Sequence, residues 1–335
     1  MAISSACKQD PVQFAWTDLP KIPDHVGFAG SFAGVSNNTL IVAGGANFPD
    51  GGAPWTGSKK VWHNQVFALE SRDGVWKSIG HLPRALGYGV SISTDKGLIM
   101  IGGSNEQGHY NDVYMLKYTD DSITYDILPS LPGPLANSAG VVMDNVIYVM
   151  GGTMAPASTE AENNFWSLDL NDLDADWNVL ESWPGPSRML SVAGTDGRSV
   201  YLFSGAHLEE GVREYLTDSY KFSIEEGWER LADLPRAVVA APTPAYTDKN
   251  NNLFILGGDD GSLADIDPQK DEHPGFSKSV LRYSVQSDEW TDVAVQPGKA
   301  AVTTPLVIWN NEVVIPGGEI KPAVRTTQVR SLVVK

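Results

Sequence analysis

The stretch LIMIGGSNEQGHYNDVYMLK (98–117) holds a pattern that recurs along the chain. An apolar run ends in two small residues, a polar loop follows, and a short segment containing aromatic residues comes next. Short apolar runs bounded by glycine favour strands over helices. The same apolar run and small pair occur in IVAGG (41–45), YVMGG (148–152), LFSG (202–205), FILGG (254–258) and VIPGG (314–318). The chain therefore consists of six repeats.

The spacing of these repeats predicts the architecture. The second glycines stand at 45, 103, 152, 205, 258 and 318, so neighbouring repeats are 49 to 60 residues apart. In most repeats a Trp opens the next strand and a Leu-Pro-like turn follows, as in Trp76 with HLP and Trp228 with DLP. Four-stranded repeats at about this period are typical of Kelch β-propellers. We therefore predict an all-β fold, a six-bladed Kelch-type β-propeller.

The two ends of the chain predict how the ring closes. QFAWTDLP, around Trp16, contains a Trp and a Leu-Pro turn but stands before any glycine pair, whereas the last repeat stops at SLVVK without a Trp strand. We expect the N-terminal strand to complete the last blade, which leaves no exposed strand edge there. The predicted organisation is a flexible tail over 1–11 and a single propeller over 12–335.

Composition narrows the classes of partner. The formal net charge is -17, and a surface this acidic repels nucleic acid and anionic lipid. No segment is apolar over the length needed to span a membrane. The one cysteine, Cys7, excludes an intrachain disulfide, and the six His show no metal-ligand spacing, so we expect no metal site. The SSAC tetrapeptide around Cys7 resembles the remnant of a processed leader. Nothing in the pattern specifies an oligomeric state.

Strand parity predicts which loops share a face. The loops after the glycine pairs lie on the same face as the loops that enter each blade, and long loops on a rigid scaffold commonly carry binding residues. Several cationic side chains and one glutamate are therefore expected near the channel mouth: Lys21, Arg84, Arg188, Arg236, Lys299, Glu319, Lys321 and Arg325. Such a cluster indicates a small anionic ligand, because guanidinium groups pair with carboxylates. The alternative is that each Arg after a Leu-Pro turn is a structural residue between blades.

Three segments carry a resemblance to a known family. GGEIKPAVRT (317–326), GFAGSFAGVSNNTLIVAGGANF (27–48) and RALGYGVS (84–91) are similar to segments of the sialic acid mutarotase (N-acetylneuraminate epimerase) family, whose members are six-bladed Kelch propellers. PGPSR (184–188) is a weaker match. In the bacterial family the glutamate segment precedes the FAG-like segment, whereas here it follows. The chain resembles a cyclically permuted member of the family.

The resemblance implies an isomerase that interconverts the anomers of N-acetylneuraminate or a related sugar acid without a cofactor. It implies that Glu319 is the catalytic base, that Arg325 acts beside it, and that Arg325 and Arg188 hold the substrate carboxylate. Further substrate-binding residues implied by the matching segments are Arg84, Lys321 and Asn47. It also implies a periplasmic or secreted protein.

The sequence also fits a function of another class. A non-catalytic Kelch propeller that binds a protein or a glycan on its loop face fits the same fold, because propellers host many functions. Aromatic side chains in the loops, such as Trp55 and Phe276, agree with this alternative.

Overall fold

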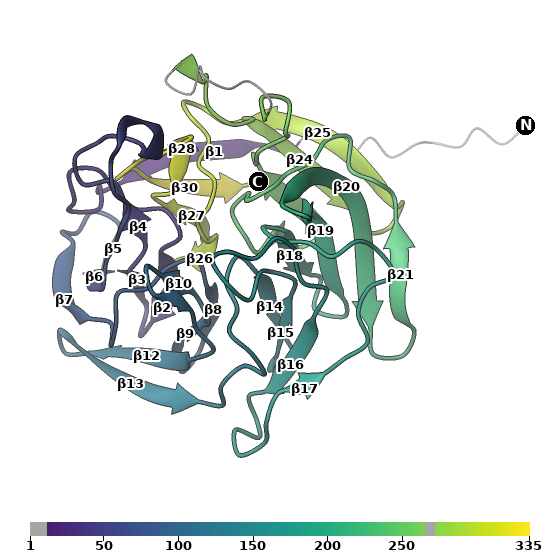
Figure 1. Cartoon of the computed structure of the whole chain (residues 1–335), viewed down its shortest axis with the longest axis horizontal. Coiled ribbons are helices and arrows are strands. Elements are labelled where there is room, and N and C mark those ends of the chain that lie inside the picture. Colours follow the sequence, from purple (N-terminus) through teal and green to yellow (C-terminus); the bar gives the residue numbers. More distant parts are fainter. Residues whose placement is uncertain (1–11, 265–271) are drawn as a thin grey trace, which may run out of the picture.

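A computed structural model describes residues 12–264 and 272–335 of the chain. Six four-stranded antiparallel sheets stand around a central axis, as Figure 1 shows. The predicted six-bladed β-propeller is confirmed. The predicted tail over 1–11, with Cys7, lies outside the described residues.

The first three blades follow the chain in order, each from the innermost strand to the outermost. Blade 1 contains β2 (Phe32–Ser36), β3 (Thr39–Ala43), β6 (Gln65–Leu69) and β7 (Lys77–His81). Blade 2 contains β8 (Val90–Thr94), β9 (Gly97–Ile101), β12 (Val113–Thr119) and β13 (Ser122–Leu128). Blade 3 contains β14 (Ala139–Met143), β15 (Val146–Met150), β16 (Phe165–Asp169) and β17 (Asn178–Val179).

The last three blades complete the ring. Blade 4 contains β18 (Val192–Thr195), β19 (Val200–Glu209), β20 (Val212–Ser223) and β21 (Gly227–Leu231). Blade 5 contains β22 (Tyr246–Thr247), β23 (Asn252–Leu256), β24 (Ser279–Ser284) and β25 (Glu289–Val295). Blade 6 contains β26 (Val307–Trp309), β27 (Glu312–Pro316), β30 (Val329–Val334) and β1 (Phe14–Leu19).

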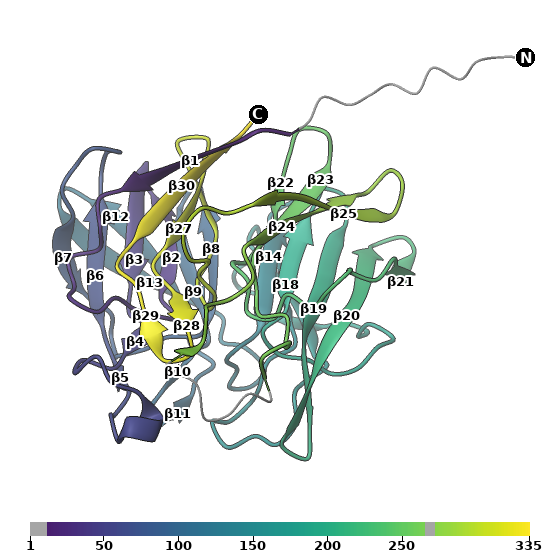
Figure 2. The ribbon, with the colours of Figure 1, turned by 90° about the horizontal axis from the view of Figure 1, so that it is seen from above.

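Strand β1 closes the ring as predicted. It pairs antiparallel with β30 over its whole length, from Phe14 opposite Val334 to Leu19 opposite Val329. Both views show the two strands side by side, β1 in purple and β30 in yellow (Figures 1 and 2). The first and last parts of the chain are thus fastened to each other by one strand ladder.

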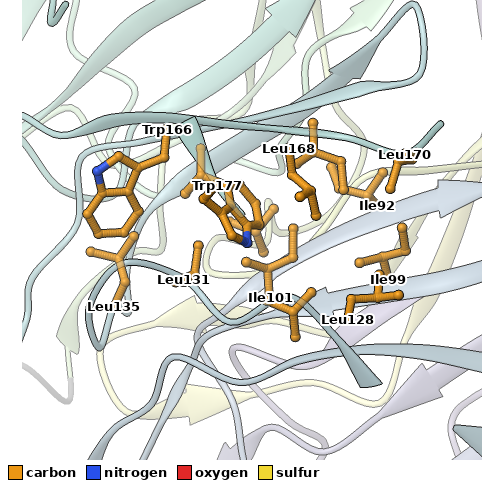
Figure 3. Close-up of a cluster of buried hydrophobic side chains, with 14 of the residues drawn as sticks. Ile92, Ile99, Ile101, Leu128, Leu131, Leu135, Trp166, Leu168, Leu170 and Trp177 are labelled. Atoms are coloured by element: carbon orange, nitrogen blue, oxygen red, sulfur yellow. The ribbon is translucent and has the colours of Figure 1, made fainter. Parts of the chain in front are cut away.

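Every sheet has apolar side chains on both of its faces. The hydrophobic core therefore lies between neighbouring blades. The second strands are the most enclosed, and all five residues of β3, β9 and β23 are buried. Figure 3 shows one such interface, a buried cluster that contains Trp166 and Trp177 of blade 3 together with Ile99 and Ile101 of blade 2. Burying such surface is what holds the blades in a ring.

The recurring aromatic residue of the outer strand also ties one blade to the previous one. The indole N–H of Trp76 donates to the carbonyl of Pro20 at 2.7 Å, and that of Trp177 donates to Pro129 at 2.8 Å. Tyr125, which replaces the Trp in blade 2, donates its hydroxyl to the carbonyl of His81 at 2.9 Å. The aromatic residue and the Leu-Pro turn therefore recur together because they contact each other.

The glycine pairs mark the closest approach between blades. At Gly102, φ is +60° and a Cβ would lie 2.4 Å from the carbonyl oxygen of Leu135 in the loop that enters the next blade. A side chain does not fit at that distance, and glycine adopts positive φ without strain.

Six residues close a hydrogen-bonded ring around the channel. They occupy equivalent positions in the entering loops, all have positive φ, and each N–H donates to the carbonyl of the preceding one at 2.7–2.9 Å: Gly30, Tyr88, Asn137, Leu190, Ala240 and Thr303. Three short hairpins lie on this side of the molecule: β4 (Ala46–Asn47) with β5 (Val61–Trp62), β10 (Ser104–Asn105) with β11 (Gly108–His109), and β28 (Glu319–Lys321) with β29 (Val324–Arg325). Figure 2 shows them together at one end of the blades, so the predicted common loop face is present.

Candidate functional site

The loop face carries a cavity of about 320 Å³, within the size range of small-molecule sites. Its walls come from three consecutive blades: Arg213 and Tyr215 of blade 4, Asp259 and His273 of blade 5, and Glu319 of blade 6. A cavity of about 410 Å³ lies among the inner strands toward the opposite face, but none of the described residues that line it is charged. Of these two cavities, only the one on the loop face is lined by carboxylate, imidazole and guanidinium groups.

Glu319 is held in the cavity wall by a tight hairpin. It directly follows the glycine pair, and its backbone pairs with Val302 of the entering loop. The hairpin turns at Pro322 and Ala323, where φ of Ala323 is +63°, and the N–H of Ala323 donates to Oε1 of Glu319 at 2.9 Å. The side chain is 18% exposed, so the carboxylate is fixed but accessible.

Arg325 lies beside Glu319 but is not among the residues that line the cavity. Its Nη1 is 3.2 Å from Oε2 of Glu319, and its guanidinium lies over the ring of Phe48. The side chain is 4% exposed, and its Nε and Nη1 make no hydrogen bond to the described residues. Buried N–H groups are usually paired, so an ordered water oxygen is expected beside these donors.

Asp259 is a second carboxylate in the same cavity, which sequence reasoning missed. Its Oδ1 accepts the N–H of Gly261 at 3.1 Å, and its Oδ2 accepts the hydroxyl of Tyr215 at 3.2 Å. Burial raises the pKa of Tyr215 to about 12. A signal was present in the sequence, because GGD at 257–259 repeats the arrangement of GGE at 317–319.

Arg213 reaches the cavity because blade 4 departs from the pattern of the other blades. The segment after Gly205, expected to be a loop, continues β19 and β20 as a long hairpin in which Arg213 pairs with Leu208. Glu210 and Gly211, both with positive φ, form its two-residue turn. The hairpin carries the exposed guanidinium of Arg213 to the cavity wall.

His273 presents a defined tautomer to the cavity. Its Nδ1 accepts the backbone N–H of Gly275 at 3.1 Å, so in the neutral ring the proton resides on Nε2. The imidazole can then donate one hydrogen bond from Nε2 to a ligand. The sequence singled out neither His273 nor Arg213. Their positions at the cavity depend on how the long segments after the glycine pairs fold over the ring.

Arg188 does not face the cavity, and its predicted contact with a substrate carboxylate disagrees with its position. The side chain is fully buried, and both terminal nitrogens donate to Asp218 at 2.7 Å. Nη1 also donates to the carbonyl of Ser204, and Nε to that of Pro186. Burial alone would raise the pKa of Asp218, but the hydrogen bonds from Arg188 hold it below its usual value. Each of the three guanidinium nitrogens therefore has a hydrogen-bond partner in the protein, and in this sense the Arg188–Asp218 pair is saturated.

The repeats explain why Arg188 is structural. It occupies the position just before the bridging residue of the entering loop, where the other five blades have an apolar residue: Phe28, Leu86, Leu135, Val238 and Ala301. Blade 4 therefore fills a core position with an ion pair.

The remaining predicted contacts also lie outside the cavity wall. Arg84 pairs with Asp112 at 3.0 Å and lies over the ring of Tyr110. Asn47 is buried and donates to the carbonyl of Gly27, and Asn105 makes the equivalent bond to Ala85 in blade 2, which indicates a structural role.

Lys321 stands at the tip of the Glu319 hairpin, opposite Val324. Arg236, another member of the expected cationic cluster, is directed into its own blade, where it donates to the carbonyls of Ala237 and Gly257. Of the four arginines expected at the channel mouth, only Arg325 therefore contacts Glu319.

Residues 12–264 and 272–335 contain no group of three or more His, Cys, Asp or Glu side chains placed to hold a metal ion. The same part of the chain contains no helix long and apolar enough to cross a membrane.

The chain matches proteins of known family. The family model described as N-acetylneuraminate epimerase matches residues 4–125 and 128–267. The N-acetylneuraminate epimerase of Haemophilus influenzae (strain PittEE) is 33% identical over 222 residues, which cover 60% of this chain and 57% of that protein. The one of Yersinia pestis (strain Pestoides F) is 44% identical over 90 residues, covering 24% of this chain and 22% of that protein. The chain thus aligns with little more than half the length of the Haemophilus protein.

A solved structure shows the same fold. The structure of YjhT superposes with a TM-score of 0.69 and 17% identity, covering 95% of this chain and 99% of that chain. The family-model match ends before Glu319, so the site assignment rests on the 317–326 segment and its geometry. With most of its length matched by the family model, this chain belongs to the N-acetylneuraminate epimerase family.

Proposed function

We propose that the protein interconverts the anomers of N-acetylneuraminate, or of a closely related sugar acid, by general acid–base catalysis. The observation that carries the proposal is the position of Glu319, a fixed and accessible carboxylate in the wall of a cavity of ligand size. Family membership and the names of the relatives support the substrate class.

In this proposal Glu319 takes the proton of the anomeric hydroxyl. The bond between the anomeric carbon and the ring oxygen then breaks, the open-chain carbonyl turns over, and the ring closes on its other face. General acid–base assistance is worth on the order of a hundred- to ten-thousand-fold in rate. No atom changes its oxidation state in these steps, so the proposed reaction uses no redox cofactor.

The cations have separate parts in this scheme. Arg325 positions Glu319 through their ion pair, and Arg213, in the cavity wall, attracts the carboxylate of the sugar acid. Guanidinium groups suit this task because they bind carboxylates with two parallel hydrogen bonds. Arg188 takes no part, because its guanidinium is already bound to Asp218.

The test follows freshly released α-N-acetylneuraminate by proton NMR, with no protein, with the unaltered protein, and with two variants. Glu319→Gln removes the base, and Glu106→Gln removes an exposed carboxylate of the same face in blade 2 as a matched control. We expect acceleration by the unaltered protein and the control, and a loss of about a hundred-fold or more with Glu319→Gln.

Two other outcomes are informative. A Glu319→Gln variant as fast as the unaltered protein would show that the base is another group. No acceleration with this or other reducing sugars would overturn the enzyme proposal and leave the non-catalytic binding module in its place.

We also propose that the protein works in the periplasm or outside the cell. The support is the resemblance to a family with periplasmic members. Fractionation of the source cells, with detection of the native protein by antibody, tests this, and recovery from the cytoplasm alone would refute it.

A further inference from the structure

We propose that Asp259 is the second proton-transfer group of the cavity, and that Tyr215 positions it. This rests on the function proposed above, which needs both a group that takes the anomeric proton and a group that gives a proton to the ring oxygen. Glu319 accounts for the first of these.

The backbone places Asp259 and Glu319 in equivalent positions of adjacent blades. Each directly follows a glycine pair, and each forms a bridge to its own entering loop, Asp259 with Val239 and Glu319 with Val302. The entering loops are joined directly, since the N–H of Thr303 donates to the carbonyl of Ala240 at 2.7 Å. The other four blades have a residue at this position that does not exchange protons near neutral pH: Ala46, Ser104, Thr153 and Ala206. Acids therefore occur only at the two neighbouring positions that share the cavity.

The two carboxyl groups are anchored in the same way but have different second partners. One oxygen of each accepts a backbone N–H from its own loop, from Gly261 for Asp259 and from Ala323 for Glu319. The other oxygen of Glu319 faces the cation of Arg325, whereas that of Asp259 accepts the hydroxyl of Tyr215. The raised pKa of Tyr215 means that this hydroxyl remains neutral and able to donate.

This difference assigns the two roles. Glu319 begins the cycle as the base, because an ionised carboxylate keeps its ion pair with Arg325. We assign the acid role to Asp259, because its contacts are hydrogen bonds from Gly261 and Tyr215 and not an ion pair with a described cation. Two carboxyl groups in unlike surroundings are a recurring basis for acid and base roles in one site.

The proton transfers balance over a complete cycle. Glu319 takes the anomeric O–H proton, and that electron pair forms the carbonyl as the bond to the ring oxygen breaks. The ring oxygen keeps the pair of the broken bond and takes the proton of Asp259. After the carbonyl has turned over, Asp259 removes the proton from the attacking hydroxyl and Glu319 returns its proton to the carbonyl oxygen. Both side chains end as they began.

The experiment measures kcat, KM and their pH dependence by the NMR assay for the unaltered protein, Asp259→Asn, Asp259→Ser and Tyr215→Phe. Asp259→Ser is included because Ser104 occupies the equivalent position in blade 2, so this variant retains a residue that the fold accepts. Ser104→Ala is the matched control. We expect kcat to fall about a hundred-fold or more in both Asp259 variants with little change in KM, and less than about ten-fold in Tyr215→Phe.

The pH profile separates a catalytic from a structural role. The unaltered protein should show a bell-shaped kcat/KM, and the Asp259 variants should lose the decline on the alkaline side, where the acid would be deprotonated. If the protein and its Glu319→Gln variant behave as proposed but Asp259→Ser keeps kcat within about three-fold, or keeps the alkaline decline, this inference is overturned while the proposed function stands. If the unaltered protein does not accelerate the reaction, the proposed function fails and this inference fails with it.

Discussion

Two arginine–carboxylate pairs of this propeller share the same chemistry but differ in their surroundings. In Arg188–Asp218 the guanidinium is fully buried, and two carboxylate oxygens and two carbonyls accept its protons. In Arg325–Glu319 the contact is a single approach of 3.2 Å, Nε and Nη1 of Arg325 lack hydrogen-bond partners among the described residues, and Glu319 borders a cavity. A saturated pair serves packing, whereas a pair with open donors next to a cavity can serve a ligand. Residue type does not distinguish the two pairs, but the position of Glu319 in the cavity wall and its greater exposure do.

The largest expected effect is loss of stability on breaking the saturated pair. Arg188→Leu leaves the Asp218 carboxylate buried without its cation, which typically costs about 3–5 kcal/mol of unfolding free energy. Urea unfolding followed by circular dichroism measures this loss.

A double variant provides the control. Arg188→Leu with Asp218→Asn should recover most of the stability, since blade 2 has Leu86 and blade 3 has Asn164 at the equivalent positions. Arg188→Leu alone being as stable as the unaltered protein would show that the ion pair is not a structural element.

Breaking the Arg325–Glu319 pair should lower the reaction rate more than it lowers the stability of the fold. Arg325→Met removes the cation that positions Glu319, and we expect kcat/KM to fall about ten-fold or more, which corresponds to at least about 1.4 kcal/mol of transition-state stabilisation. The loss of unfolding free energy should be smaller than in Arg188→Leu, because Glu319 remains accessible to water. The NMR assay and urea unfolding of the same sample measure the two effects. If Arg325→Met unfolds more readily than Arg188→Leu and reacts at the normal rate, then the Arg325–Glu319 pair is structural and its assignment to the active site is wrong.

Acid should weaken the saturated pair in a predictable direction. The pKa of Asp218 is lower in the folded protein than in the unfolded chain, because the Arg188 hydrogen bonds outweigh burial. Its stabilising contribution is therefore complete above about pH 4 and is lost as the pH falls through the lower folded-state value. Urea midpoints measured from pH 5 downward should decrease more for the unaltered protein than for the Arg188→Leu/Asp218→Asn variant. Parallel decreases would show that other carboxylates account for the acid sensitivity.

The smallest expected effect concerns the turn that holds Glu319. Ala323 has φ of +63°, a conformation that costs an L-residue with a Cβ roughly 1–2 kcal/mol. Ala323→Gly should relieve this strain, offset in part by the greater freedom of glycine in the unfolded chain, for a net gain between zero and about 1 kcal/mol. Thermal unfolding measures the gain, and the reaction rate should be unchanged because the N–H that binds Glu319 is kept. A clear loss of rate would show that the rigidity of the turn contributes to catalysis.

The repeat pattern determined the architecture because its causes are local. The glycine pairs are required where the backbone of the next entering loop leaves no room for a Cβ, as at Gly102. The Trp and Leu-Pro elements recur because they bond to each other across the blade junction, as in Trp76 with Pro20. The Trp16 strand that lacked a glycine pair before it had only one place to pair, beside β30.

The candidate site was predictable only in part. The sequence singled out Glu319 and Arg325, and the structure brings them together as the two arms of one hairpin. The sequence did not show whether the Arg188 side chain points into the protein or toward the loop face. That direction depends on whether the adjacent blade has a buried carboxylate that can pair with it. In blade 4 that blade supplies Asp218.

Tertiary structure also decided which residues share the cavity. Asp259 and Glu319 are sixty residues apart, and Tyr215 and Arg213 come from a third blade, so no local pattern relates them. They meet because the radial arrangement sets equivalent positions of adjacent blades next to each other and because β19 and β20 extend past the ring. The sequence by itself determined the repeat, the closure and the family resemblance, which depend on contacts that every repeat makes. Only the folded ring decided which charged groups are saturated and which remain free to act, because that depends on neighbours from other blades.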